Sequence, residues 1–162
     1  MNDQWSKIYD EHGARVRAIL FRLCITADLD DLVQDCFVKV WKNLPEFRGE
    51  ASLKTWITRI AINTAHDYLR RRKFDVVSEE IDELNLAAPP KVESEYGQMI
   101  LNALNALSVP HREVLVLSVL EEHTLEEIAE MTGAPVGTVK SRLFHAREQM
   151  KRMLQKYGVQ YE

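Results

Sequence analysis

The chain has 162 residues, of which 46% are hydrophobic and 28% are charged, and its formal net charge is −4. This length allows one domain or two small ones, and the composition is ordinary for a soluble protein. No apolar run reaches the length of a membrane span, and the first residues lack the pattern of a signal peptide. We therefore expect a cytoplasmic protein without a uniform basic coat for nucleic acid.

Two helical patterns open the chain, over residues 5–24 and 28–44. Each has one apolar side, and Pro45 follows directly on the second pattern. The second pattern also holds Gln34, Asp35, Val38 and Trp41 on another side. An exposed tryptophan at that position would require a partner surface.

A third helical pattern covers residues 53–73, and Ser52 is a candidate cap for it. One face is apolar, whereas another face carries cations around the amide of Asn63. The polar residues of that face are Lys54, Arg59, Asn63, His66, Arg70 and Arg71. Nearby aromatic residues, Phe47, Trp56 and Tyr68, could stack on bases while the cations hold the backbone of strand-separated DNA. The alternative is that Trp56 belongs to the core and the arginines form a solvated helix end.

Charge is strongly segregated after this helix. Four cations in succession end the segment 68–73, and residues 74–95 then hold seven acids against Lys91 alone. The acidic segment contains "AAPP" and lacks sustained periodicity, so it predicts a flexible linker. The chain is thus expected to form two helical domains, over 1–75 and 96–162, joined by an acidic linker over 76–95.

A helix-turn-helix is predicted in the second domain. Thr124 is a candidate N-cap, and Glu127 stands where a capping box places its acid. Gly133 suits a turn residue with positive φ, and Pro135 suits the start of the next helix. Apolar residues then recur at helical spacing, namely Val136, Val139, Leu143 and Ala146. Two short helices meeting at a glycine are the arrangement of a helix-turn-helix.

The exposed side of the second helix is expected to be cationic. Its polar residues include Thr138, Lys140, Ser141, Arg142, His145, Arg147, Lys151 and Arg152, with Glu148 as the main acid. A solvated face would normally mix its signs. The pattern therefore favours a DNA-reading helix over an ordinary helical hairpin packed for stability.

The motifs "DLVQDCFVKVWKNLPEFRGEASLKTWITRIAINTAHDYLRRRK" and "LEEIAEMTGAPVGTVKSRLFHAREQMK" together resemble the extracytoplasmic-function (ECF) group of bacterial sigma factors. The resemblance covers nearly the whole chain. It implies an all-α fold with sigma domain 2, which grips RNA polymerase and opens the −10 element, and sigma domain 4, which reads the −35 element. It also implies that the acidic linker replaces the third domain of housekeeping sigma factors and follows the RNA exit path of the polymerase.

Roles for individual residues follow from this resemblance alone. Contacts with the β′ clamp helices of core polymerase are expected for Asp31, Gln34, Asp35 and Trp41. Contacts with the −10 element are expected for Phe47, Arg59, Asn63, Arg70, Arg71 and Arg72, with Phe47 as the wall of a pocket for a flipped base and Asn63 on the base edge. Contacts with the −35 element are expected for Thr138, Lys140, Ser141, Arg142, Phe144 and His145, where His145 replaces an arginine common in related sequences. Further expected partners are the β flap and an anti-sigma factor, whereas direct insertion into a membrane is not expected.

Three other interpretations were weighed against this one. A stand-alone helix-turn-helix regulator leaves residues 31–41 without a task, and a protein-interaction adaptor would show no salt-dependent affinity for DNA. An enzyme is not indicated, because the five histidines are scattered without acids at metal-ligand spacing and no glycine-rich phosphate loop is present. No cofactor or metal is predicted. Cys24 and Cys36 are interpreted as buried core thiols, with a redox-active or metal-responsive pair as the alternative.

Overall fold

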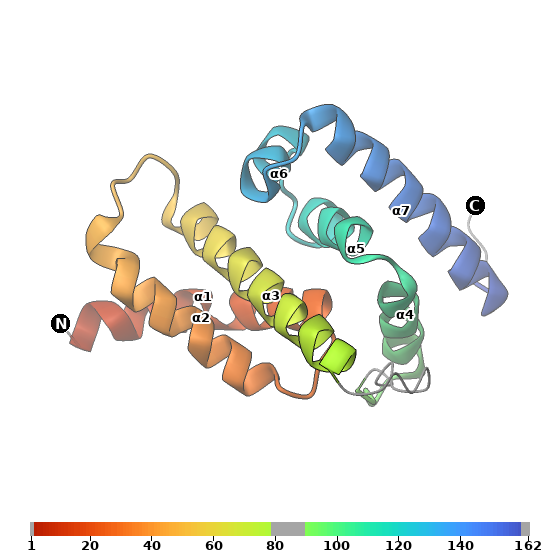
Figure 1. The fold of residues 1–162 in the computed structure, drawn as a ribbon, viewed down its shortest axis with the longest axis horizontal. Coiled ribbons are helices and arrows are strands. Elements are labelled where there is room, and N and C mark those ends of the chain that lie inside the picture. The colour runs from red at the N-terminus through yellow and green to blue at the C-terminus, as the bar shows by residue number, and fades with distance from the viewer. Residues whose placement is uncertain (1, 79–89, 160–162) are drawn as a thin grey trace. The chain divides into compact units, whose positions relative to one another are not determined.

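The computed structural model describes residues 2–78 and 90–159, which form helices joined by short loops in two compact units, Met1–Ala88 and Pro89–Glu162 (Figure 1). The predicted all-α class with two small helical domains is thereby confirmed. The interior of the predicted linker, residues 79–89, lies outside the described residues. The domain limits at 75 and 96 stay predictions.

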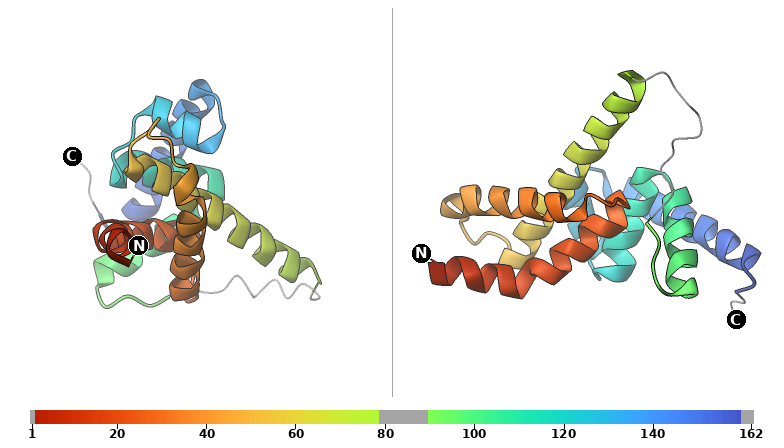
Figure 2. Two further views of the ribbon diagram at one scale, coloured as in Figure 1. Left: turned by 90° about the vertical axis from the view of Figure 1, so that its left-hand side faces the viewer. Right: turned by 90° about the horizontal axis from the view of Figure 1, so that it is seen from below.

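Three helices build the first unit: α1 (Asn2–Cys24), α2 (Leu29–Asn43) and α3 (Leu53–Ser78). Each contacts the other two, and the right-hand view of Figure 2 shows α1 and α2 side by side, with α3 crossing them at an angle. Their apolar faces form one core, whose most deeply buried residues are Val16, Ile19, Leu20, Cys36, Val40, Ile57, Ala61, Ile62 and Ala65. Because each helix has only one broad apolar side, the three stripes are buried only when they face a common centre.

The third helix is longer than its sequence pattern predicts. The pattern ends at Lys73, whereas α3 continues to Ser78 and so enters the segment expected to be linker. Adding a residue to an existing helix fixes one residue for one backbone hydrogen bond, so that a formed helix extends readily past its last packed turn. Ser52 caps the other end as expected, since its Oγ accepts a hydrogen bond from the Thr55 N–H at 3.1 Å.

Polar contacts fix the register of the helices in the first unit. The hydroxyl groups of Thr26 and Tyr68 are 2.7 Å apart, and Lys39 Nζ lies 3.1 Å from the carboxylate of Asp67. The hydrogen bond from Lys39 is the main cause that lowers the pKa of Asp67, and the charges of Lys39 and Arg70 add to it, while burial opposes it. These contacts connect α3 both to α2 and to the loop that precedes α2.

Helices α4 (Glu95–Ala106), α5 (Val109–Leu115), α6 (Leu125–Thr132) and α7 (Val136–Lys156) form the second unit. A turn of π-helix, η2 (Val116–Leu120), extends α5. The core lies between α7 and the other helices and includes Leu101, Leu104, Val114, Val116, Leu117, Ile128, Val139, Leu143 and Ala146. Ser94 and Ser108 cap α4 and α5 by accepting hydrogen bonds from backbone N–H groups in the first turn. Helices α4, α5 and α6 thus pack on one side of the long α7 and leave its other side exposed.

One buried histidine predicts how the stability of the first unit depends on pH. His12 is 6% exposed, and burial, followed by the charge of Arg15, lowers its pKa below the ordinary value of 6.5, against an opposing effect of Glu11. The unfolded chain therefore takes up this proton at a higher pH than the folded chain does. We expect the free energy of unfolding to be level above about pH 6.5 and to fall as the pH drops below it. Urea unfolding between pH 7.5 and 5.5 should show this slope in the wild type and a smaller slope in His12→Gln, whereas equal slopes would contradict it.

Candidate nucleic-acid interface

The turn between α6 and α7 has the geometry that its sequence predicts. Thr124 and Glu127 form a capping box, in which the Glu127 N–H donates to Thr124 Oγ1 at 3.2 Å and the Thr124 N–H donates to Glu127 Oε2 at 3.1 Å. Gly133 ends α6 in the left-handed conformation, with φ 73°, and its N–H donates to the carbonyl of Ala129 at 2.9 Å. A side chain at Gly133 would be strained, because L-residues rarely adopt this conformation. The predicted helix-turn-helix is confirmed.

One residue of the predicted apolar stripe does not belong to the core. Val139 is fully buried, as its place in the stripe predicts, but Val136 is 41% exposed. Val136 is the first residue of α7, directly after Pro135. The first turn of α7 therefore presents an apolar side chain to solvent, next to the exposed Gly137.

The predicted reading residues share one side of α7. Lys140, Ser141, Phe144 and His145 are exposed and occupy positions i, i+1, i+4 and i+5, which lie on one helix face. Phe144 is 62% exposed, and its ring lies 5.5 Å from that of His145 in an edge-on arrangement. The exposed ring gives this otherwise polar face an apolar surface, which is suited to cover an apolar group of a ligand.

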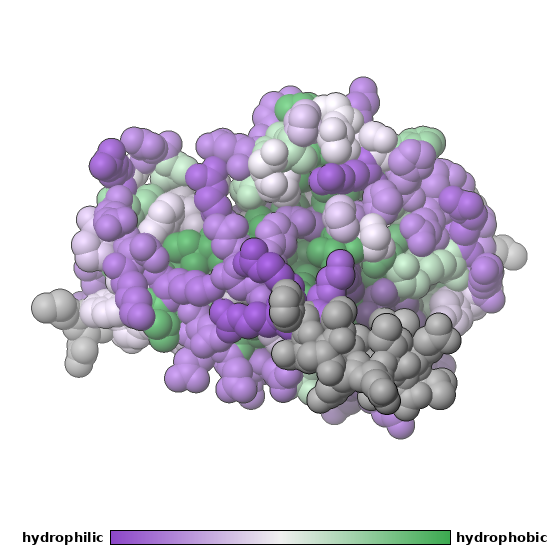
Figure 3. Space-filling view, viewed as in Figure 1, coloured by the Kyte–Doolittle hydropathy of each residue, from purple (hydrophilic) through white to green (hydrophobic). Residues whose placement is uncertain are grey.

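The remaining predicted contacts border this face. Thr138 and Arg142 are half-buried one turn apart, on the neighbouring stripe of α7. Further along the helix, Arg147, Lys151 and Arg152 are exposed together with Glu148. Figure 3 shows mostly hydrophilic side chains over α7, at the upper right of the view. A face with an excess of cations is a favourable surface for the phosphates of a nucleic acid.

His111 was not predicted as a site residue from the sequence, but its ring lies near that of His145 on the exposed face of α7. His111 belongs to the first turn of α5, where its Nδ1 lies 2.7 Å from Ser108 Oγ. Its ring centroid is 6.4 Å from that of His145 on α7, again edge-on. The two histidines are 34 positions apart, so that only the packing of α5 on α7 brings them together.

The loop after α2 and the first turns of α3 bring two aromatic residues into contact. A short 3-10 helix, η1 (Leu44–Glu46), is followed by Phe47, whose ring lies 5.2 Å from that of Trp56 at an angle of 47°. Both side chains are half-buried, and the loop between them ends at Ser52. The sequence placed Phe47 and Trp56 near the cationic face of α3, and the structure joins them in one tilted pair.

Asn63 is exposed on α3, seven residues after Trp56 and therefore on the same side of the helix. Arg59 is half-buried between them, and Arg70 follows seven residues after Asn63. In the basic end of the helix, Arg70 and Arg71 are exposed and Arg72 is half-buried. Arg70 also forms an ion pair with Asp67. An aromatic pair, an amide and several guanidinium groups thus follow one another along α3, which is a suitable surface for bases and phosphates of single-stranded DNA.

The four residues predicted to contact core polymerase lie on the exposed side of α2. Asp31, Gln34 and Asp35 are exposed, and Trp41 is 41% exposed. Trp41 is supported from α1 by Trp5, whose ring lies 5.0 Å away in an edge-on arrangement. A large aromatic group that is held in place and yet open to solvent is typical of a protein-binding surface.

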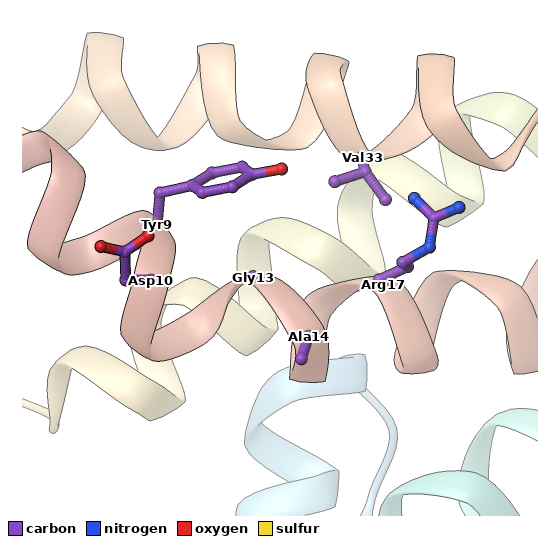
Figure 4. A pocket seen from close by; sticks show the side chains of 6 residues that line it. All are labelled: Tyr9, Asp10, Gly13, Ala14, Arg17 and Val33. Carbon is purple, nitrogen blue, oxygen red and sulfur yellow. The ribbon is translucent and has the colours of Figure 1, made fainter.

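A hollow of about 250 Å³ lies between α1 and α2. It is lined by Tyr9, Asp10, Gly13, Ala14, Arg17 and Val33. Figure 4 shows the ring of Tyr9 lying along one end and Arg17 at the other. Arg17 forms an ion pair with Asp30 at 2.6 Å. The volume is smaller than most cofactor or drug-sized ligand sites, which begin at about 300 Å³.

Cys24 and Cys36 are free and buried, which confirms their interpretation as core thiols. Burial raises the pKa of the Cys36 thiol to about 11, although a hydrogen bond with Thr64 and the charge of Lys39 act in the opposite direction. Such a thiol is almost entirely protonated at neutral pH, and the thiolate is the reactive form. Over residues 2–78 and 90–159, no group of three or more His, Cys, Asp or Glu side chains could hold a metal ion. None of the helices in the same ranges is long and apolar enough to cross a membrane.

Comparisons with known proteins agree with both halves of this description. The family model for Sigma-70 region 2 matches residues 8–74, and the model for Sigma-70 region 4 matches residues 97–150. The ECF RNA polymerase sigma-E factor of Haemophilus influenzae is 32% identical over 155 residues, which cover 87% of this chain and 82% of that protein. The sigma-E factor of Escherichia coli is 30% identical with similar coverage, 87% and 81%.

A solved structure with a similar fold is the sigma factor RpoE from Bartonella quintana, in complex with the anti-sigma factor NepR. Its TM-score is 0.82 at 28% identity, and the match covers 96% of this chain and 98% of that one. The similarity of fold extends over both units. The chain belongs to the ECF family of RNA polymerase sigma factors.

Proposed function

We propose that this chain is an alternative sigma factor, which binds core RNA polymerase and directs transcription from promoters with specific −10 and −35 elements. The observation that supports this proposal best is the pairing of two different surfaces in one chain. One unit carries a helix-turn-helix with an exposed reading face, and the other carries an aromatic pair and an amide suited to single-stranded DNA. A protein of this kind acts by binding, without catalysing a reaction itself, and works in the cytoplasm beside the chromosome.

The face of α7 would enter the major groove of the −35 element. Lys140, Ser141, Phe144 and His145 are exposed together and would contact base edges, whereas Thr138 and Arg142 on the neighbouring stripe would contact phosphates. The chemistry is suitable, because lysine can donate to guanine and an apolar ring can cover a thymine methyl group. The second unit would be held at this position by the β flap of the polymerase.

The α3 surface would capture a base of the −10 element. Phe47, supported by Trp56, would form the wall of the pocket, and Asn63 would hydrogen-bond to the edge of the flipped base. Flipping costs a few kcal/mol, which stacking and hydrogen bonding offset. Phosphates of the opened strand would be held by the surrounding guanidinium groups, those of Arg59, Arg70, Arg71 and Arg72.

The exposed side of α2 would bind the β′ clamp helices of core polymerase through Asp31, Gln34, Asp35 and Trp41. The three polar side chains are exposed in one row ahead of the tryptophan, as a polar rim beside an aromatic anchor. Residues 76–95 would connect the two domains as an acidic linker along the RNA exit path. A negatively charged segment could occupy a channel that binds RNA, because the linker and RNA are both anionic and attract the same cationic groups.

We also infer that an anti-sigma factor controls this protein. The support is the structural neighbour from Bartonella quintana, which was solved with its anti-sigma factor NepR. The exposed Trp41 and Phe144 mark one surface in each unit that a protein inhibitor would cover. Covering the surface around Trp41 would block binding to core polymerase, and covering the surface around Phe144 would block binding to the −35 element.

Two substitutions on α7 should separate a base contact from a phosphate contact. Lys140→Ala should cost about 1–3 kcal/mol of discrimination at one or two positions of the −35 element, the range for a good contact to a base edge. Arg142→Ala should weaken all promoters alike and lower the salt dependence of binding by about one unit. Transcription from promoters randomised across the −35 element measures both effects. A uniform loss for Lys140→Ala would show that this lysine does not read sequence.

A native gel shift separates the proposed function from its alternatives. We expect the chain alone to bind duplex DNA weakly and to bind promoter DNA tightly once core polymerase is added. A stand-alone regulator would bind duplex DNA tightly without polymerase. A protein-interaction adaptor would show no salt-dependent affinity for DNA in either case.

A further inference from the structure

A residue of α1 ties down the first turns of α3. The guanidinium of Arg15 donates one hydrogen bond to Thr58 Oγ1 and another, at 3.2 Å, to the backbone carbonyl of Lys54. Thr58 is fully buried, and its hydroxyl donates in turn to the Lys54 carbonyl at 2.8 Å. The Arg15 guanidinium, the Thr58 hydroxyl and the Lys54 carbonyl therefore form one small hydrogen-bond network between α1 and α3. Water cannot reach Thr58 to take the place of these bonds, because the residue is fully buried.

This network lies in the same turns of α3 as Trp56, which contacts Phe47. Lys54 and Thr58 flank Trp56 in the sequence, and Trp56 supports Phe47 across the loop at 5.2 Å. Within α3, the same turns are held at their start by Ser52, which caps the Thr55 N–H. Arg15 thus adds a fixed point from another helix to the turns that orient the aromatic pair.

We propose that Arg15 is a positioning residue for base capture during promoter opening: it acts through Lys54 and Thr58 to hold the Trp56–Phe47 pair in place. The proposal rests on the function proposed above for that pair. Arg15 itself would touch neither DNA nor polymerase in this role. Its loss should therefore affect the binding of an unpaired −10 strand and leave the affinity for core polymerase unchanged.

His12 makes this network sensitive to acid. Its Nδ1 lies 3.4 Å from the guanidinium of Arg15 and must accept there, because a guanidinium offers donors only. The charged groups around the buried ring are Arg15 and Glu11 on α1 and Lys54 on α3. A proton on His12 would remove the acceptor and place a third cation beside Arg15 and Lys54. Burial and Arg15 lower the pKa of His12, so that the neutral form which the network requires prevails at neutral pH.

A matched pair of substitutions at Thr58 tests the network without altering charge. Thr58→Ser keeps the hydroxyl acceptor, whereas Thr58→Val keeps the shape and removes it. The probe is a fluorescein-labelled single strand spanning the −10 element of a promoter identified by run-off transcription, bound to holoenzyme made from each variant. We expect Thr58→Val to weaken binding of this strand about 2- to 12-fold, the range for one hydrogen bond, and Arg15→Met to weaken it roughly tenfold or more. Thr58→Ser should bind nearly as the wild type does.

The controls distinguish this inference from the proposed function. Core-polymerase affinity, measured by competition, should be unchanged in all three variants. Equal losses in Thr58→Ser and Thr58→Val, or normal strand binding by Arg15→Met, would overturn the positioning role. Equal loss of core affinity and strand binding in both Arg15→Met and Thr58→Val would also overturn it, in favour of a purely structural role. A wild-type holoenzyme that does not bind the strand would instead contradict the proposed function.

The pH arm uses the same probe at pH 7.5 and pH 5.0, because the pKa of His12 in the folded protein lies below its ordinary value of 6.5. Wild-type holoenzyme should lose more strand affinity on acidification than holoenzyme carrying His12→Gln, whose amide oxygen can accept from Arg15 at both values. Equal losses would overturn the role of His12 in the network.

Discussion

Replacing Asn63 with alanine should lower the rate of open-complex formation about 5- to 150-fold, which corresponds to about 1–3 kcal/mol for a side-chain contact to a base edge. The amide is exposed on α3, on the same side as the Phe47–Trp56 pair, and is assigned to a flipped base. Stopped-flow fluorescence of a promoter labelled in the −10 element measures the rate. Without the amide, the unpaired base would keep its stacking and lose its hydrogen bonds.

A matched control for this variant is Asn105→Ala, which removes an exposed amide from α4 in the other unit. It should open promoters at the wild-type rate. Affinity for core polymerase should be the same for both variants, because neither amide lies on the α2 surface. If Asn63→Ala lost core affinity, the division of tasks between α2 and α3 would be wrong.

The second large effect is expected on the α2 surface. Trp41→Ala should weaken binding to core polymerase by about 2–4 kcal/mol, as is typical of a central aromatic anchor. Asp35→Arg should weaken it too, because the substitution inverts a charge in the row of polar residues ahead of Trp41. A competition assay against the wild-type chain for core polymerase measures both.

The control for charge inversion is Glu126→Arg, which replaces an exposed acid in the first turn of α6, in the other unit. It changes the net charge as Asp35→Arg does and should leave core affinity unchanged. Should Asp35→Arg and Trp41→Ala both bind core polymerase normally, the clamp contact would have to lie elsewhere on the protein.

Local features of this fold could be predicted from the sequence because their causes lie within a few residues. The capping box of Thr124 and Glu127, the left-handed Gly133 and the cap at Ser52 each depend on residues three or four positions apart. The burial of Val139 follows from helical spacing after that turn. The same holds for the candidate faces, since Lys140 and Phe144 are one turn apart.

Contacts between helices could not be predicted in the same way. Arg15 and Thr58 are 43 positions apart, and nothing in their spacing indicates that they meet. The support of Trp41 by Trp5 and the proximity of His111 and His145 likewise depend on how two helices pack. Such pairs are decided by the rotation and register of whole elements, to which many side chains contribute at once.

Two features of the second unit could not be predicted from its apolar pattern. Val136 fits the apolar period of α7, yet as the first residue of that helix it is 41% exposed. The π-helical turn Val116–Leu120 lies in an almost continuous apolar run, residues 114–120, in which no helical period can be recognised. After it, Glu122 adopts φ 57°, a conformation that few residues other than glycine favour.

Reconstituted run-off transcription tests the central claim most directly. Core RNA polymerase is incubated with the purified chain on fragmented genomic DNA of the source organism, and transcript ends are mapped. We predict discrete start sites that require the chain, with shared sequence elements near −35 and −10, and a reduced yield of these transcripts with Asn63→Ala. Transcripts that are the same with and without the chain would contradict the assignment of this protein as a sigma factor.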